Sequence, residues 1–93
     1  MTESELFVLS QAFRALSQPR RLALFREVLS AGESGIELAR LRADSDRPST
    51  LSMHLKALHR GRLIFESGDD ARRVHADLER VGEAMSALQA IDR

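Results

Sequence analysis

The chain of 93 residues is 43 % hydrophobic and 30 % charged, has a net charge of zero, and contains no cysteine, tryptophan or tyrosine. This length allows one domain (1–93) with a core of aliphatic side chains and four phenylalanines, and the lack of cysteine excludes disulfides and thiolate metal sites. No run of about 18 apolar residues occurs and the first residues are acidic, so we expect neither a membrane span nor a secretion signal, and a cytoplasmic location.

The charge is unevenly distributed although its sum is zero. Residues 14–42 carry six arginines against three glutamates, and residues 47–75 carry five arginines and one lysine against three acids. Each of the three remaining segments has two more acids than bases. A basic middle between acidic ends is compatible with a polyanionic partner despite the neutral total.

Two amphipathic helices are predicted at the start of the chain. From Glu3 to Leu16, apolar residues recur at spacings of 3, 4 and 3, which is one face of a helix. This face consists of Leu6, Leu9, Phe13 and Leu16. Pro19 begins a second helix, because proline suits the first turn and the residue before it disfavours helical angles. The second helix continues to about Ala31 and is ended by Gly32.

A short helix and a longer one follow the next loop. Ile36 to Leu41 is predicted as a helix of under two turns, and the polar segment 42–47, which contains capping residues, leads to Pro48. The stretch PSTLSMHLKALHR, from Pro48 to Arg60, is the fourth predicted helix, and Gly61 ends it.

A β-hairpin and a fifth helix complete the predicted elements. Leu63–Glu66 and Arg73–Ala76 are strand-like runs on either side of a loop with glycine and aspartates. From Asp77, a helix repeats the apolar spacing of 3, 4 and 3. Its apolar residues are Leu78, Val81, Met85 and Leu88. The predicted fold is therefore mainly α with a small β-hairpin, in the order α-α-α-α-β-β-α.

The fourth predicted helix has an apolar face and a polar, cationic face. Leu51, Leu55 and Leu58 lie on the first. The second consists of Ser49, Ser52, Met53, Lys56 and Arg60. Small side chains permit close approach to a DNA groove, hydroxyls bond to phosphates or base edges, and cations neutralise phosphate. Taken alone, this face is also typical of any solvated surface helix.

The short helix, the loop and the fourth helix have the order of a helix-turn-helix, and the hairpin places Arg72 and Arg73 in a possible wing. Several sequence blocks accompany this order: AFRALSQPRRLALFREVL, ELA, STLSMHLKAL, LIF and ARRVHADL. Together they resemble the ArsR/SmtB family of bacterial winged helix-turn-helix repressors over almost the whole chain. The family's S-x-H-L-K-x-L core matches at Ser52, His54, Leu55, Lys56 and Leu58.

The resemblance implies a homodimer on double-stranded DNA, with two recognition helices in successive major grooves of a near-palindromic operator. Groove contacts are expected from Ser49, Thr50, Ser52, Met53 and Lys56. Phosphate contacts are expected from Arg47, Arg60, Arg72 and Arg73. His54 is expected to support the recognition helix or to touch the DNA backbone.

The resemblance also implies that the first and last helices hold the dimer. The interface residues are expected to be Leu6, Leu9, Phe13, Leu78, Val81, Met85 and Leu88. The 3, 4, 3 stripes fit this role, but they also fit helices that cover the chain's own core.

The chain departs from the family where many members bind metal. Ser34 and Ile36 stand at the places of two sensing cysteines, and all three histidines precede the last helix, so we expect no metal and no cofactor. Met53 replaces an arginine that is common in the family, and Asp69 and Asp70 place negative charge at the wing tip. The sequence contains neither a phosphate-binding loop nor a nucleophile elbow, so no motif in it indicates an enzyme.

The sequence therefore favours a sequence-specific DNA-binding transcriptional regulator, a homodimeric repressor that is not controlled by a cysteine metal site. A winged-helix module that binds a protein instead of DNA remains an alternative, since the net charge is zero and the wing tip is acidic. A small-molecule effector is compatible with the first hypothesis, but no residue identifies one.

Overall fold

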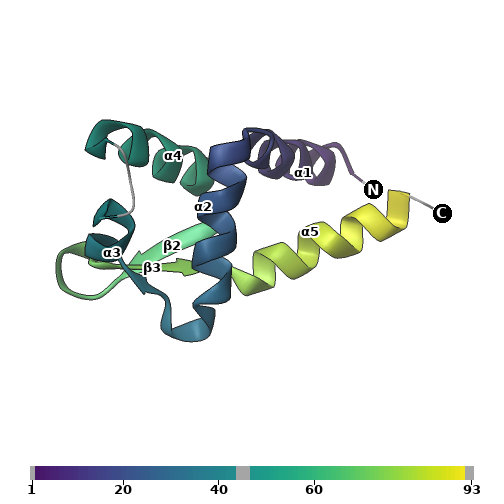
Figure 1. Ribbon diagram of the computed structural model, residues 1–93. Helices are drawn as coiled ribbons and strands as arrows, with labels where there is room; N and C mark the ends of the chain where they lie inside the picture. The colour runs from purple at the N-terminus through teal and green to yellow at the C-terminus, as the bar shows by residue number, and fades with distance from the viewer. Residues whose placement is uncertain (1, 44–46, 92–93) are drawn as a thin grey trace.

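The computed structural model describes residues 2–43 and 47–91. The elements in chain order are α1 (Glu3–Leu16), α2 (Pro19–Ser30), η1 (Gly32–Ser34), β1 (Ile36–Glu37), α3 (Leu38–Ala43), α4 (Pro48–Arg60), β2 (Ile64–Ser67), η2 (Asp69–Ala71), β3 (Arg73–Ala76) and α5 (Leu78–Ile91). The protein is mainly helical, with one small antiparallel sheet in the strand order β1-β3-β2. Figure 1 shows α3 and the β2–β3 hairpin at one end of the molecule and both chain termini at the other.

The predicted long helices are confirmed, with bounds close to those expected. α1 and α4 begin and end at the predicted residues, and α2 ends one residue early. Local capping explains two of the starts. The Thr2 hydroxyl accepts a hydrogen bond from the Glu5 amide at 3.1 Å, and the Gln18 side chain accepts one from the Arg21 amide at 2.9 Å.

The third predicted helix is wrong at its start. Ile36 and Glu37 form strand β1 and pair with Val74 and Arg73 of β3, so the sheet has three strands instead of the two of a hairpin. α3 begins only at Leu38, and residues 44–46 of the predicted polar segment lie outside the described residues.

Gly35 explains why β1 can lie so close to β3. Its φ is +73°, and a Cβ at this position would lie 2.6 Å from Nδ1 of His75 and 2.7 Å from the carbonyl oxygen of Val74. Neither the backbone angle nor the space suits another residue. The hairpin itself is confirmed to within one residue, with Ile64 opposite Ala76 and Ser67 opposite Arg73.

One cluster of buried apolar side chains joins the helices to the sheet. Its largest fully buried members are Val28, Leu41, Leu58, Leu63 and Val74. Burying one such side chain contributes about 1.5–3 kcal/mol relative to leaving it in water. The predicted apolar face of α4 is confirmed, since all three of its leucines are buried in this cluster.

Gly61 was expected to end α4 through the left-handed backbone conformation that glycine favours, but the structure gives it a different role. Its backbone is in the ordinary helical region, and Arg62 adopts the left-handed conformation instead, with φ +60°. A Cβ on Gly61 would lie 3.1 Å from Cβ of Ala15. The glycine therefore permits the close approach of α1 to the end of α4.

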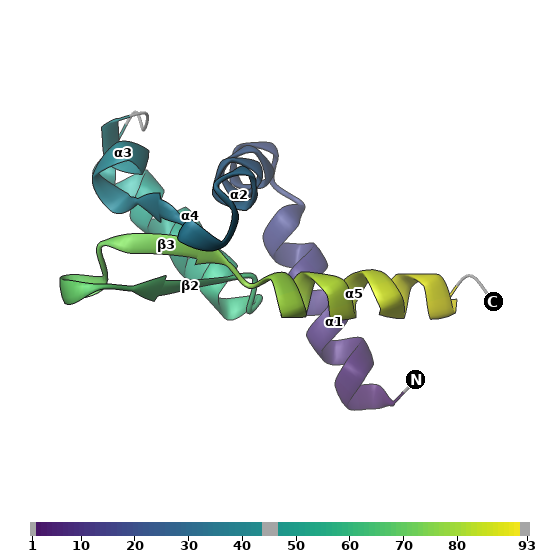
Figure 2. The ribbon, with the colours of Figure 1, turned by 90° about the horizontal axis from the view of Figure 1, so that it is seen from below.

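Helices α1 and α5 contact each other and leave the core at the same end of the molecule (Figures 1 and 2). Figure 2 shows α5 continuing beyond the sheet as a single helix. No helix within the described ranges is long and apolar enough to cross a membrane.

Candidate nucleic-acid interface

The outer face of α4 consists of exposed polar and cationic side chains. Ser49, Ser52, Met53, Lys56 and Arg60 are all exposed, whereas Thr50 is half-buried. The helix contains no aspartate or glutamate. Because the apolar face of α4 is buried against the rest of the protein, the outer face keeps a stable orientation toward solvent. Arg47, the residue before the helix, is also exposed.

A hollow extends from this face to α1 and to the start of α2, and we name it the cationic hollow. Its lining residues are Gln11, Arg14, Ala15, Arg21, Ser49, Ser52, Met53, Lys56, Ala57 and Arg60. Four of them are cations and none is acidic. Within the described part of the chain, Arg14, Lys56 and Arg60 take part in no ion pair. The hollow is therefore suited to an anion.

Sequence reasoning did not assign Arg14 or Arg21 to this site. Both precede the predicted helix-turn-helix, and only tertiary packing brings them to α4. The signal that could have found them is the excess of arginine in residues 14–42, which contains no element predicted to contact DNA.

Arg21 and His54 join three helices beneath the outer face of α4. Arg21 Nη1 donates to the carbonyl oxygen of Ala15 at 3.2 Å, and its Nε donates to Nδ1 of His54 at 3.4 Å. Since guanidinium is only a donor, Nδ1 of His54 accepts, and the ring proton is on Nε2. Burial, together with the positive charges of Arg21 and Arg20, lowers the pKa of His54.

The expected contact of His54 with DNA is therefore corrected. Its side chain is only 6 % exposed and is neutral near pH 7, so it cannot reach or neutralise a phosphate from this position. The other expected role, support of the helix, fits the contact with Arg21.

Arg72 and Arg73 are adjacent in the sequence but lie in different environments. The Arg72 side chain is 77 % exposed, and its nearest acidic partner is Asp70 at 3.8 Å. This ion pair is screened by solvent and leaves Arg72 accessible. Asp69 and Asp70 are exposed in the turn, so the predicted negative charge at the tip of the hairpin is accessible too.

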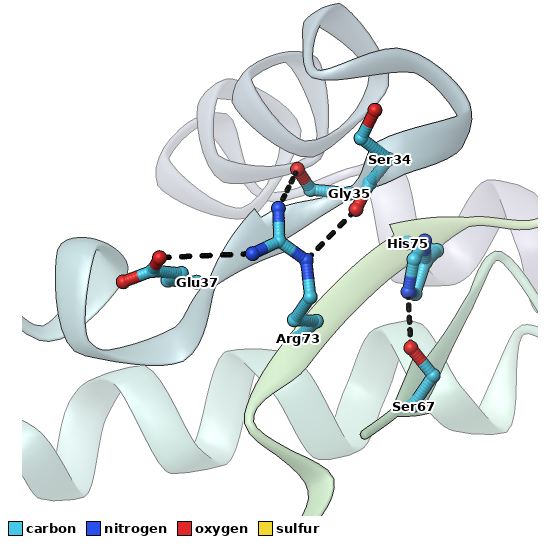
Figure 3. A network of polar contacts seen from close by, with 6 residues as sticks. All are labelled: Ser34, Gly35, Glu37, Ser67, Arg73 and His75. Atoms are coloured by element: carbon cyan, nitrogen blue, oxygen red, sulfur yellow. Dashed lines mark hydrogen bonds and ion pairs between the residues drawn. The ribbon is translucent and has the colours of Figure 1, made fainter.

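Arg73 faces the protein instead of a ligand (Figure 3). Its Nε donates to the carbonyl oxygen of Ser34 at 2.9 Å, Nη2 donates to that of Gly35 at 3.2 Å, and Nη1 lies 3.6 Å from Oε1 of Glu37. The expected phosphate contact of Arg73 stays a prediction, and it would have to compete with these bonds to residues 34–37.

His75 lies two residues along β3 and binds the same segment. Its Nδ1 donates to the carbonyl oxygen of Glu33 at 2.9 Å. Its Nε2 accepts from the hydroxyl of Ser67, as Figure 3 shows. The ring stacks on Phe65, with centroids 4.8 Å apart. Arg73 and His75 together form what we call the β3 clamp, which joins the hairpin to residues 33–37.

The apolar surface of α1 and α5 is only in part what the sequence predicted. Five of the expected interface residues are 43–59 % exposed: Leu6, Phe13, Leu78, Met85 and Leu88. Leu9 is corrected, because it is buried within the chain. Val81 is half-buried and packs against the core, and its place in an interface stays a prediction. Phe7, which was not expected at the interface, is 62 % exposed. These six exposed apolar side chains of α1 and α5 are candidates for an interaction surface, because contiguous exposed apolar patches mark such surfaces.

The described residues contain no group of three or more histidines, aspartates or glutamates placed to hold a metal ion. Ser34 lies in η1 and Ile36 in β1, the first supplying a backbone carbonyl to the β3 clamp. No protein-family model matches the chain, and no curated protein sequence matches it.

Proposed function

We propose that the protein is a sequence-specific DNA-binding transcriptional regulator, a homodimeric repressor of the winged helix-turn-helix type that resembles the ArsR/SmtB family. The order α3, α4, hairpin, α5 is compatible with such a domain. In this proposal α4 is the recognition helix and the β2–β3 hairpin is the wing.

The observation that carries the proposal is the exposed, acid-free outer face of α4 next to the cationic hollow. DNA presents one negative charge per about 1.7 Å of helix axis, and cations that neutralise phosphates supply most of the affinity. Ser49 and Ser52 are short enough to let α4 approach base edges in the major groove. Lys56, Arg60 and Arg72 then bind the backbone and set the register.

The dimer in this proposal forms through the exposed apolar residues of α1 and α5. Burying them removes apolar surface from water at about 25 cal/mol per Å². A two-fold axis beside these helices relates two copies of α4, which then contact half-sites about one helical turn apart. An operator with that symmetry is occupied by both subunits at once, and occupancy of a promoter blocks transcription.

The test is fluorescence anisotropy on a labelled duplex from upstream of the protein's own gene and on a scrambled duplex, each at several salt concentrations. We expect salt-sensitive binding that favours the upstream duplex by about a thousandfold or more. In the Lys56→Ala variant the slope of log affinity against log salt decreases by about 1. Failure of the wild-type protein to bind any duplex at low salt contradicts the proposal.

A second candidate function is a winged-helix module that binds a protein partner. It is favoured by the exposed Asp69 and Asp70 at the hairpin tip, which repel phosphate. This alternative predicts no salt-dependent affinity for DNA, so the same titration separates the two functions.

A further inference from the structure

The cationic hollow has no acidic residue, in contrast to two other charged hollows lined by the described residues. The hollow between α2, β1 and α3 combines three arginines with Glu27 and Glu37. The hollow at the base of the hairpin combines Arg62 and Arg80 with acids of α5. In both, opposite charges compensate each other, whereas the charges of the cationic hollow repel one another until an anion enters.

The four cations of the hollow come from three helices, and they differ in whether their side chains are held by other residues of the protein. Arg21 is half-buried and holds Ala15 and His54, so it contributes charge from a defined position. Arg14, in the last turn of α1, and Lys56 and Arg60, on α4, are exposed and in no ion pair within the described chain. Their head groups are available to a ligand.

We infer that Arg14 binds a phosphate of the DNA backbone in the cationic hollow, so that α1 belongs to the DNA-binding surface together with α4. This inference rests on the proposed function. The hollow is continuous with the outer face of α4, because Ser49, Ser52 and Met53 belong to both. A strand whose bases lie against that face therefore has a phosphodiester next to the hollow. A guanidinium binds phosphate with two parallel hydrogen bonds, and the serine hydroxyls add further donors.

This role connects the two proposed surfaces of the protein. α1 contributes Leu6 and Phe13 to the apolar surface of α1 and α5, and in its last turn it contributes Arg14 to the cationic hollow. The close approach of α1 to the end of α4 at Gly61 keeps Arg14 near Lys56 and Arg60. A change in how two copies of α1 pack would therefore move a DNA contact.

The experiment compares Arg14→Gln with Arg26→Gln on the duplexes described above. Arg26 is also an exposed arginine, but it lines the hollow between α2, β1 and α3, which shares no residue with the cationic one. Both variants lose one positive charge, so a difference between them reports position and not net charge. Thermal unfolding of each variant checks that the fold is retained.

For Arg14→Gln we expect affinity to decrease by about tenfold on both duplexes, with the preference for the upstream duplex unchanged. The slope of log affinity against log salt decreases by about 0.9, the value for one phosphate. Arg14→Lys keeps the charge and restores most of the slope. Arg26→Gln leaves affinity and slope at the wild-type values.

Two results overturn the inference in distinguishable ways. If the wild-type protein binds DNA and Lys56→Ala weakens it, but Arg14→Gln behaves like Arg26→Gln, then α1 makes no phosphate contact and the proposed function stands. If the wild-type protein binds neither duplex at low salt, both the proposed function and the role of Arg14 are wrong.

Discussion

The outer face of α4 and the α1–α5 end of the molecule both expose side chains that the core does not use, but their chemistry is opposite. The α4 face carries serines, a lysine and an arginine, which water solvates without a partner. The α1–α5 end exposes leucine, phenylalanine and methionine. Exposure of apolar area to water is unfavourable by about 25 cal/mol per Å², so covering this end with another surface lowers the free energy.

The two surfaces differ in the kind of partner that their chemistry favours. In the proposed function, a polyanion would bind the α4 face by charge and be released by salt. An apolar partner would bind the α1–α5 end with little dependence on salt. The predictions that follow separate these surfaces from the core and from each other.

The largest expected effect is on stability, from shortening a buried side chain. Leu58→Ala should lower the free energy of unfolding by about 2–5 kcal/mol, because Leu58 is fully buried and the change leaves a cavity. Leu88→Ala makes the same chemical change at a side chain that is 43 % exposed, and should cost much less. Urea denaturation of dilute protein measures both. Equal losses would mean that the α1–α5 end is already part of a complete core.

The next effect concerns assembly. Replacing Met85 and Leu88 by glutamate introduces charge into the exposed apolar stripe of α5, and should convert a dimer into a monomer with unchanged helix content. Sedimentation equilibrium measures the mass, and circular dichroism checks the fold. Arg80→Glu is unsuitable as a control on the same helix, because it would break the ion pair between Arg80 and Glu83, whose atoms lie 2.8 Å apart.

Gln89→Glu is the better control for this experiment, since an exposed polar residue of α5 acquires the charge instead. That variant should keep the mass of the wild-type protein. A wild-type protein that sediments as a monomer at concentrations well above those used for DNA binding would refute the proposed interface.

A smaller effect should distinguish the two neighbouring arginines of the hairpin. Arg73→Ala removes two hydrogen bonds of the β3 clamp and should lower the free energy of unfolding by about 1 kcal/mol. Arg72→Ala should leave stability within about 0.5 kcal/mol, because the side chain is 77 % exposed, while weakening DNA binding. Unfolding and anisotropy measurements on both variants check this assignment. If Arg73→Ala weakened DNA binding without loss of stability, and Arg72→Ala did the opposite, Arg73 would be the DNA contact.

The smallest effect is the pH dependence that His54 confers. The pKa of His54 is lowered from its ordinary value of 6.5, so the unfolded chain binds this proton first as the pH falls. His54 therefore leaves stability unchanged above about pH 6.5 and reduces it below that pH, until the folded ring is itself protonated.

His54→Asn does not titrate and keeps an acceptor for Arg21. Between about pH 7.5 and pH 5.5, the free energy of unfolding of the wild-type protein should therefore decrease more than that of the variant. Urea denaturation at the two pH values measures this difference. An equal decrease in the free energy of unfolding of both proteins would show that burial does not lower the pKa of His54.

The helices were predictable because their signals are local. Pro19 and Pro48 mark two helix starts, and the spacing of Leu51, Leu55 and Leu58 alone separates the buried from the exposed face of α4. The polar face of that helix could be read in the same way, since a side chain that is not needed by the core must point to solvent.

The errors fall where partners distant in sequence decide the outcome. Ile36 and Glu37 become a strand only because Val74 and Arg73 of β3, distant in the sequence, pair with them, and two residues contain no period by which to recognise a strand. Leu9 shares the stripe of its exposed neighbour Phe13, and only the position of the other elements buries one and exposes the other.

The sequence by itself thus determined the helical segments, the two faces of α4 and the apolar character of α1 and α5, because each depends on residues within a few positions of one another. Tertiary structure alone decided that Arg73 and His75 bind residues 33–37, that His54 is buried against Arg21, and that Arg14 lines the same hollow as Lys56. These contacts join side chains from separate elements, and their distances depend on how the whole core packs.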